Sequence, residues 1–84
     1  MNSERIVLYK NQGSGQRRIQ IKLNGSNHEV TGPISVARLI LSLDLDARKV
    51  AVERNLEIVS RSVYEQTMIE EGDRLEIVQF IGGG

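Results

Sequence analysis

The 84-residue sequence contains no cysteine. Disulfide bonds, thiolate nucleophiles and thiolate metal sites are therefore excluded, and a chain of this size relies on one small hydrophobic core. Neither sign of charge is in excess, because eleven lysines and arginines balance eleven aspartates and glutamates. Nucleic-acid-binding domains normally concentrate a basic excess on one face, so we expect no nucleic-acid partner. The local basic group of Arg17, Arg18 and Lys22 is interpreted as a solvated edge.

Long apolar runs are missing as well. No stretch approaches the roughly 20 apolar residues of a membrane-spanning helix, and residues 1–10 are too short and too charged for a signal peptide. We therefore expect a cytoplasmic protein with no membrane partner.

His28 is the one histidine, and we expect it at a solvated strand position rather than in a catalytic site. Asp44 and Asp46 fit the exit loop of a helix, so no metal site is expected.

The signals that are present describe strands and one helix. Residues 18–23 alternate polar and apolar side chains, which predicts a strand. Asn24-Gly25 favours a tight hairpin turn into a return strand over 27–31, because both positions tolerate positive φ. Ser35 is a suitable helix N-cap. After it, apolar residues recur at helical steps and predict one buried stripe, formed by Val36, Leu39, Ile40 and Leu43. Further strands are predicted over 50–52, 57–59 and 74–80.

This order of elements matches the β-grasp (ubiquitin-like) architecture. We predict an α+β domain over residues 17–81, with a mixed sheet of four to five strands and one main helix packed on one face. Residues 1–16 form an N-terminal arm that is either flexible or an extra edge strand, and residues 82–84 form a flexible glycine tail. Residues 62–69 stay open between a helical turn and an irregular connection.

The tail Gly82-Gly83-Gly84 follows an apolar strand directly. One interpretation is a loose chain end, but glycine also has a chemical use here. A carboxylate is a poor electrophile until it is activated, commonly by adenylation with ATP, and a backbone without side chains passes a narrow channel most easily. We therefore predict that Gly84 carries the activated carboxylate and that Gly82 and Gly83 thread the channel of a partner enzyme.

The last strand supplies a surface on which that partner can dock. If Leu75 and Ile77 face the core, the two-residue period turns Val78 and Phe80 outward, and exposed apolar patches of this kind mark partner sites. We predict a docking surface formed by Val78, Phe80 and Ile81. The alternative, a different register with these residues in the core, stays open.

Several segments together resemble the ThiS family, the sulfur carriers of thiamine biosynthesis. They are Val50-Ala51-Val52-Glu53, Ile58-Val59, Arg61-Ser62, Glu71-Gly72-Asp73 and the ending Glu76 to Gly84, with Ile19 to Gly25 similar to the usual start of the family. Two features depart from it, namely Ser60, where the family commonly has proline, and the arm of residues 1–16.

The resemblance implies a carrier that is not itself an enzyme and binds no cofactor. A ubiquitin-activating-like adenylyltransferase, using ATP and Mg, is implied to adenylate the C-terminal carboxylate. Sulfur from a cysteine desulfurase then gives a thiocarboxylate, and thiazole synthase takes that sulfur. Carried over by position, Gly84 bears the thiocarboxylate and Gly83 lies beside it in the channel.

Three other interpretations stay open. A sulfur carrier of the molybdopterin-synthase small-subunit type shares the fold and terminus but commonly has a Pro-Pro pair where this chain has Gln79-Phe80-Ile81. A ubiquitin-like protein modifier shares the adenylation step. A pure interaction module would have an inert tail.

Overall fold

The computed structural model describes residues 17–80, and its first two strands form the predicted hairpin. Strand β1 (Arg17–Leu23) pairs antiparallel with β2 (Ser26–Gly32). Between them Asn24 and Gly25 have φ angles of 50° and 85°, the left-handed pair that a two-residue hairpin turn requires. The arm of residues 1–16 and the tail of residues 82–84 lie outside the described residues, so these parts of the predicted organisation stay predictions.

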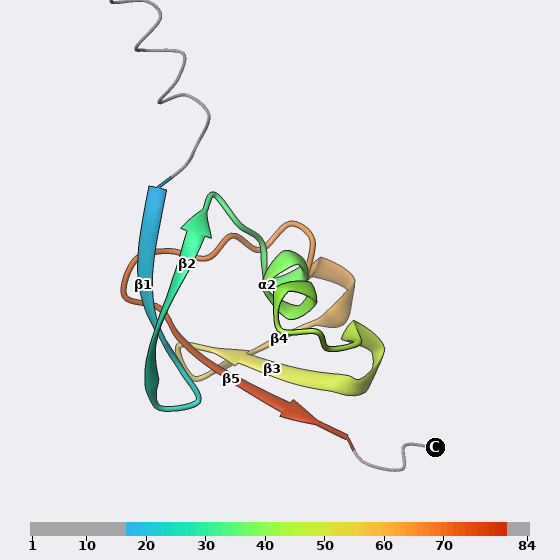
Figure 1. Ribbon diagram of the computed structural model, residues 1–84. Helices are drawn as coiled ribbons and strands as arrows, with labels where there is room; N and C mark the ends of the chain where they lie inside the picture. Colours follow the sequence, from blue (N-terminus) through green and yellow to red (C-terminus); the bar gives the residue numbers. More distant parts are fainter. Residues whose placement is uncertain (1–16, 81–84) are drawn as a thin grey trace, which may run out of the picture.

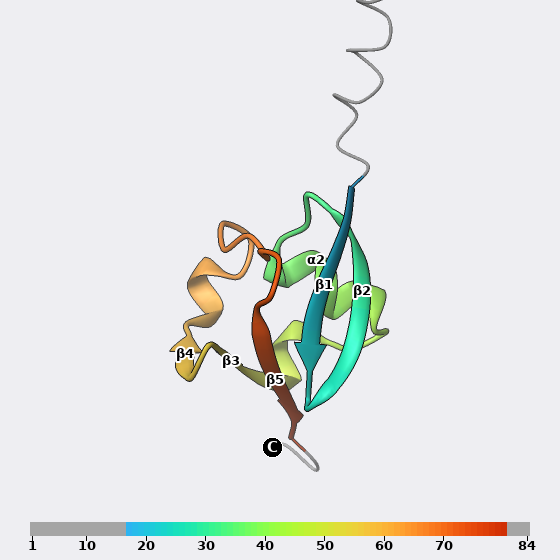
Figure 2. The ribbon, with the colours of Figure 1, turned by 90° about the vertical axis from the view of Figure 1, so that its left-hand side faces the viewer.

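Helix α2 (Val36–Ser42) begins where Ser35 predicts. The Ser35 side chain accepts a hydrogen bond from the backbone N–H of Arg38 at 3.1 Å, which satisfies one of the free donors of the first turn. Three residues of the predicted stripe, Val36, Leu39 and Ile40, are fully buried, while the fourth, Leu43, follows the helix as its C-cap and is partly buried. Figure 2 shows α2 behind β1 and β2, so that the helix covers one face of the sheet.

The remaining strands complete a five-stranded sheet in the order β2-β1-β5-β3-β4 (Figure 1). They are β3 (Val50–Arg54), β4 (Glu57–Val59) and β5 (Arg74–Gln79), and two short 3-10 turns, η1 (Ala47–Lys49) and η2 (Arg61–Val63), connect them to the rest. The central pair β1–β5 is parallel, and the other described pairs are antiparallel. A mixed sheet with one helix on one face is the predicted α+β β-grasp architecture, which is confirmed.

The core lies between α2 and the sheet. Its fully buried side chains come from the helix, from the strands and from the connection before β5. The largest are Ile19, Leu39, Ile40, Ile69 and Leu75. The open segment 62–69 is now resolved into η2, turns and an isolated bridge between Met68 and Ser35. Tyr64 in this segment is buried, and its hydroxyl donates to the carbonyl of Val50 at 3.4 Å.

The side chain of Asn24 holds the middle of the last strand, at Ile77. Its amide nitrogen donates to the carbonyl of Ile77 at 3.2 Å, and its amide oxygen accepts from the N–H of the same residue at 2.8 Å. The side chain thus continues the β1–β5 pairing beyond the end of β1 at Leu23. The residue that makes the hairpin turn therefore also positions β5.

His28 departs from the expectation of a solvated position. It lies directly opposite Ile21, whose side chain is buried, and is itself half-buried. The pairing register therefore puts His28 on the inner face of the sheet, at edge strand β2.

Within residues 17–80 no helix is long and apolar enough to cross a membrane. The same part of the chain holds no group of three or more side chains suited to bind a metal ion.

Candidate functional site

Strand β5 turns alternate side chains to opposite faces of the sheet, as predicted. Leu75 and Ile77 are 1% and 7% exposed and belong to the core, whereas Val78 and Phe80 are 58% and 47% exposed. The outward orientation of Val78 and Phe80 is confirmed, and the alternative register is wrong. The third residue of the predicted docking surface, Ile81, lies outside the described residues, as does the glycine tail.

The exposed apolar surface extends across two neighbouring strands. Ala51 lies directly opposite Val78 in the β3–β5 register, and Ile58 lies opposite Glu53 in the β3–β4 register, on the same outer side. Ile58 is 72% exposed. We call Ala51, Ile58, Val78 and Phe80 the open sheet face. Sequence reasoning missed Ala51 and Ile58, since only the pairing of the strands shows that they adjoin Val78.

The turn from β3 to β4 presents a further exposed apolar side chain. Asn55 and Leu56 have φ angles of 53° and 73°. Two consecutive left-handed residues suit a two-residue hairpin, but the second is normally glycine, because Cβ is strained in this region. Leu56 is also 87% exposed. Its side chain therefore contributes little to the core while its backbone conformation costs stability.

Replacing Leu56 by glycine should stabilise the protein. Relief of the left-handed strain exceeds the extra entropy of glycine in the unfolded chain, so we expect a gain of about 0.5–1 kcal/mol in the free energy of unfolding, measured by urea denaturation. Leu56→Ala is the matched control, which removes the side chain but keeps the strain, and should change stability by less than about 0.5 kcal/mol. Destabilisation by both variants would show instead that Leu56 packs within the fold.

The end of β5 is held by η1. The N–H of Phe80 donates to the carbonyl of Lys49 at 2.8 Å, so β5 stays attached to the domain up to the residue where the described chain ends. Figure 1 shows β5 running outward to this point, away from β1. The open sheet face and the departure point of the tail are therefore adjacent.

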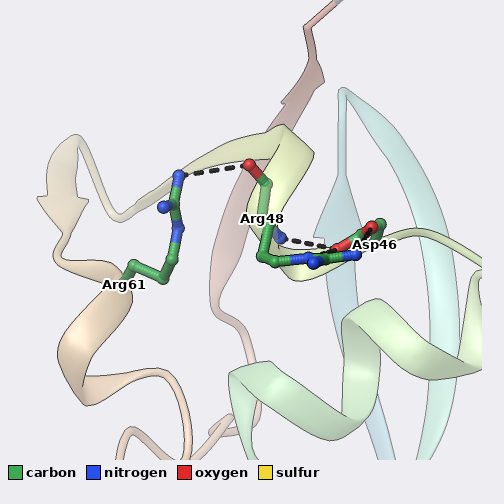
Figure 3. A network of polar contacts seen from close by, with 3 residues as sticks. All are labelled: Asp46, Arg48 and Arg61. Atoms are coloured by element: carbon green, nitrogen blue, oxygen red, sulfur yellow. Dashed lines mark hydrogen bonds and ion pairs between the residues drawn. The ribbon is translucent and has the colours of Figure 1, made fainter. Parts of the chain in front are cut away.

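A polar network stabilises the η1 turn beneath that departure point (Figure 3). The carboxylate of Asp46 accepts hydrogen bonds from the side chain of Arg48 at 2.9 and 3.1 Å and from its backbone N–H at 2.9 Å. These bonds lower the pKa of Asp46 to about 2, so the carboxylate keeps its charge further into the acid range than an ordinary aspartate does. Arg61 of η2 donates to the carbonyl of Arg48 at 3.3 Å, which links η2 to η1. The exit-loop interpretation of Asp46 is confirmed.

The other end of β5 is anchored by a buried carboxylate. Asp73 is 5% exposed and accepts hydrogen bonds from Arg54 at 2.8 Å, from Asn55 at 3.0 Å and from the N–H of Glu70 at 2.8 Å. Burial alone would raise the pKa of Asp73, but these bonds and the charge of Arg54 together lower it. In the sequence, Glu71-Gly72-Asp73 stands out only as one of the segments that resemble the ThiS family. The structure shows that it also joins β5 to the β3–β4 turn.

Fold and face together define the class: a small ubiquitin-like β-grasp domain with one sheet face uncovered in the part described. The ThiS family model matches residues 21–84. Sulfur carrier protein ThiS of Bacillus subtilis is 37% identical in an alignment of 67 residues that covers 76% of this chain and 98% of that protein. The crystal structure of a thiamine biosynthesis protein (ThiS) from Geobacter metallireducens aligns with a TM-score of 0.67 at 32% identity, covering 79% of this chain and all of that one. This chain belongs to the ThiS family.

Two longer relatives share the same stretch of sequence. A thiazole synthase of Paramagnetospirillum magneticum is 48% identical over 66 residues, and one of Magnetococcus marinus is 41% identical over 66 residues. The match covers 79% of this chain but only 20% of each of these proteins. This chain therefore spans about a fifth of the length of these two relatives.

Proposed function

We propose that this protein is a cytoplasmic sulfur carrier of thiamine biosynthesis, and that the carboxylate of Gly84 is adenylated and then converted into a thiocarboxylate. The observation that carries the proposal is the uncovered apolar sheet face at the point where the tail departs, in a chain of the ThiS family. The open sheet face would dock on a ubiquitin-activating-like adenylyltransferase, while Gly82 and Gly83 carry Gly84 through its channel.

The energetics support a mechanism in which the open sheet face docks on the partner and the glycine tail delivers the carboxylate. Ordering three tail residues costs roughly 3–6 kcal/mol, and glycine lies at the upper end of that range. Burial of roughly 200–300 Å² of apolar surface contributes about 5–7 kcal/mol. Docking through Val78 and Phe80, extended by Ile58 and Ala51, can therefore offset the ordering of the tail, and the wider contact helps to meet the entropy cost of association.

In the proposed chemistry the carrier itself supplies only the reacting carboxylate and the means of presenting it. A carboxylate oxygen of Gly84 would attack the α-phosphorus of ATP, bound with Mg by the partner, and pyrophosphate would leave. The terminal sulfur of a persulfide on a cysteine desulfurase would then attack the acyl carbon and displace AMP, forming an acyl disulfide. A reducing thiol would cleave its S–S bond, releasing the thiocarboxylate and being oxidised to a disulfide. This chain would contribute the reacting carboxylate, its delivery and the docking surface, while the catalytic groups and the cofactors belong to its partners. It would thus be a co-substrate rather than an enzyme.

The proposed acceptor of the sulfur is thiazole synthase. Two proteins with that name contain a stretch similar to this chain within one longer polypeptide. Joining two functions in one chain maintains a high effective concentration of each for the other, which is useful when one delivers sulfur to the other.

Intact-mass spectrometry tests the proposal. The protein is incubated with the adenylyltransferase and cysteine desulfurase of its own organism, with ATP, Mg, cysteine and a reducing thiol. We expect a species heavier by the replacement of one oxygen with sulfur, and fragmentation should place that sulfur on Gly84. The same mixture without ATP is the control and should give no such species.

Three results would contradict the proposal. Sulfur located at any residue other than Gly84 would exclude the carboxylate chemistry. Failure of the protein to gain sulfur, with enzymes that load a known carrier, would favour an interaction module. Isopeptide-linked products of higher mass in place of the thiocarboxylate would favour a protein modifier.

A further inference from the structure

The open sheet face contains a shallow hollow of about 150 Å³. Strands β3, β4 and β5 each contribute to its lining, which consists of Ala51, Val52, Glu53, Ile58, Glu76 and Val78. Most of this lining is apolar, so the hollow favours a flat or aliphatic group. The lining also includes the carboxylates of Glu53 and Glu76, which give the hollow a negative charge beside its apolar side chains.

Glu53 and Glu76 lie directly opposite each other in the β3–β5 register. Like charges in this arrangement repel and destabilise a sheet. Over residues 17–80, neither carboxylate takes part in a hydrogen bond or an ion pair with another described group. Elsewhere on the same face Glu29 is paired, because it accepts from Gln20 at 2.7 Å and lies 3.6 Å from Arg18. Within the described residues, the hollow thus places two unpaired carboxylates directly opposite each other.

We propose that the hollow receives an arginine side chain of the adenylating partner, a proposal that rests on the proposed function. The guanidinium would lie between Glu53 and Glu76, where its five donors can serve both carboxylates. The arginine stem and the flat face of its guanidinium would pack on Ile58 and Val78. The repulsion between the two glutamates in the free protein is then relieved on docking, which adds to the affinity and fixes the register of the partner.

The hollow fits the other candidate occupants less well. A second copy of this chain, related by a two-fold axis through this face, would bring four carboxylates together. A lysine ammonium is a compact, strongly hydrated charge that serves two separated carboxylates less well than a planar fork does. A purely apolar side chain would leave both carboxylates desolvated and unpaired.

The test measures KM and kcat for this protein in ATP–pyrophosphate exchange catalysed by the adenylyltransferase of the same organism. In the double variant Glu53→Gln/Glu76→Gln we expect KM to rise about tenfold or more, since the charge pairs are lost, with kcat within about twofold because the tail is intact. The thermal midpoint of the variant should be equal to or higher than that of the wild type, since the repulsion is removed. If Glu53 and Glu76 instead stabilised the fold, the thermal midpoint of the double variant would fall below that of the wild type. Glu29→Gln, a neutralisation on the same face outside the hollow, is the matched control and should leave KM unchanged.

Three other outcomes would count against the arginine site or against the proposed function. An unchanged KM in the double variant, with the wild type active, would overturn the arginine site and leave the sulfur-carrier proposal intact. A wild type that supports no exchange at all would instead overturn the proposed function. Association of the protein with itself in sedimentation, altered by the double variant, would assign the hollow to a second copy.

Discussion

Removal of Gly84 should abolish sulfur loading of this protein while leaving its fold and its docking unchanged. The deletion moves the carboxylate back by one residue, up to about 3.6 Å. A misplacement of only about 1 Å costs on the order of 100-fold in rate, so attack on the α-phosphorus should fall below detection. The measurement is the thiocarboxylate fraction by intact mass after incubation with the adenylyltransferase and desulfurase.

Two controls separate delivery from docking. The deleted protein should still compete with the wild type for the adenylyltransferase, because Val78 and Phe80 remain in place. Its thermal midpoint should match that of the wild type, since the change lies beyond the last strand. One added alanine after Gly84 should be equally inactive. Loading of the deleted protein at the wild-type rate would place the chemistry elsewhere in the chain.

Replacement of Asp73 by alanine should give the largest loss of stability. Arg54 and Asn55 lose their shared acceptor, and the N–H of Glu70 is left without a partner. Breaking a buried, hydrogen-bonded ion pair costs about 2–4 kcal/mol where one member is partly solvated. For a domain of this size the thermal midpoint should fall by roughly 10–30 °C. Glu70→Ala removes a nearby carboxylate but keeps the backbone N–H, and should have little effect.

The same carboxylate should make stability depend on pH in the acid range. The pKa of Asp73 is lower in the folded protein than in the unfolded chain. Its contribution is therefore fully present above the unfolded pKa and is lost as the pH falls through the folded pKa. The thermal midpoint of the wild type should decline with acid more steeply than that of Asp73→Asn, which has no charge to lose. Parallel declines in the two proteins would assign the acid sensitivity to other groups.

Local signals in the sequence were sufficient for most of the fold. Asn24-Gly25 predicts its turn because the requirement for two positive φ angles is met by two adjacent residues. Ser35 and the apolar steps after it predict α2 because capping and periodicity act within a few residues. The predicted solvated position of His28 was wrong. The register of β2 against β1, and not the neighbours of His28 in the sequence, decides which face it occupies.

The open sheet face and the anchors of β5 show the same difference between local and distant signals. The outward orientation of Val78 and Phe80 follows from the alternation within one strand, so the sequence alone determined it. The second role of Asn24, as a brace for β5, involves a residue 53 positions away and has no local signal. The anchoring role of Asp73 likewise has no local signal, because it depends on Arg54, which is 19 positions away in the sequence.

By itself, then, the sequence determined the hairpin, the helix, the outward face of the last strand and the glycine ending, because each depends on residues that are neighbours along the chain. Only the tertiary structure decided that Ala51 and Ile58 widen that face and that Glu53 meets Glu76 in its hollow. The reason is that strand register is set by the packing of distant segments onto one core, and a shift of one residue would turn every one of these side chains to the other side.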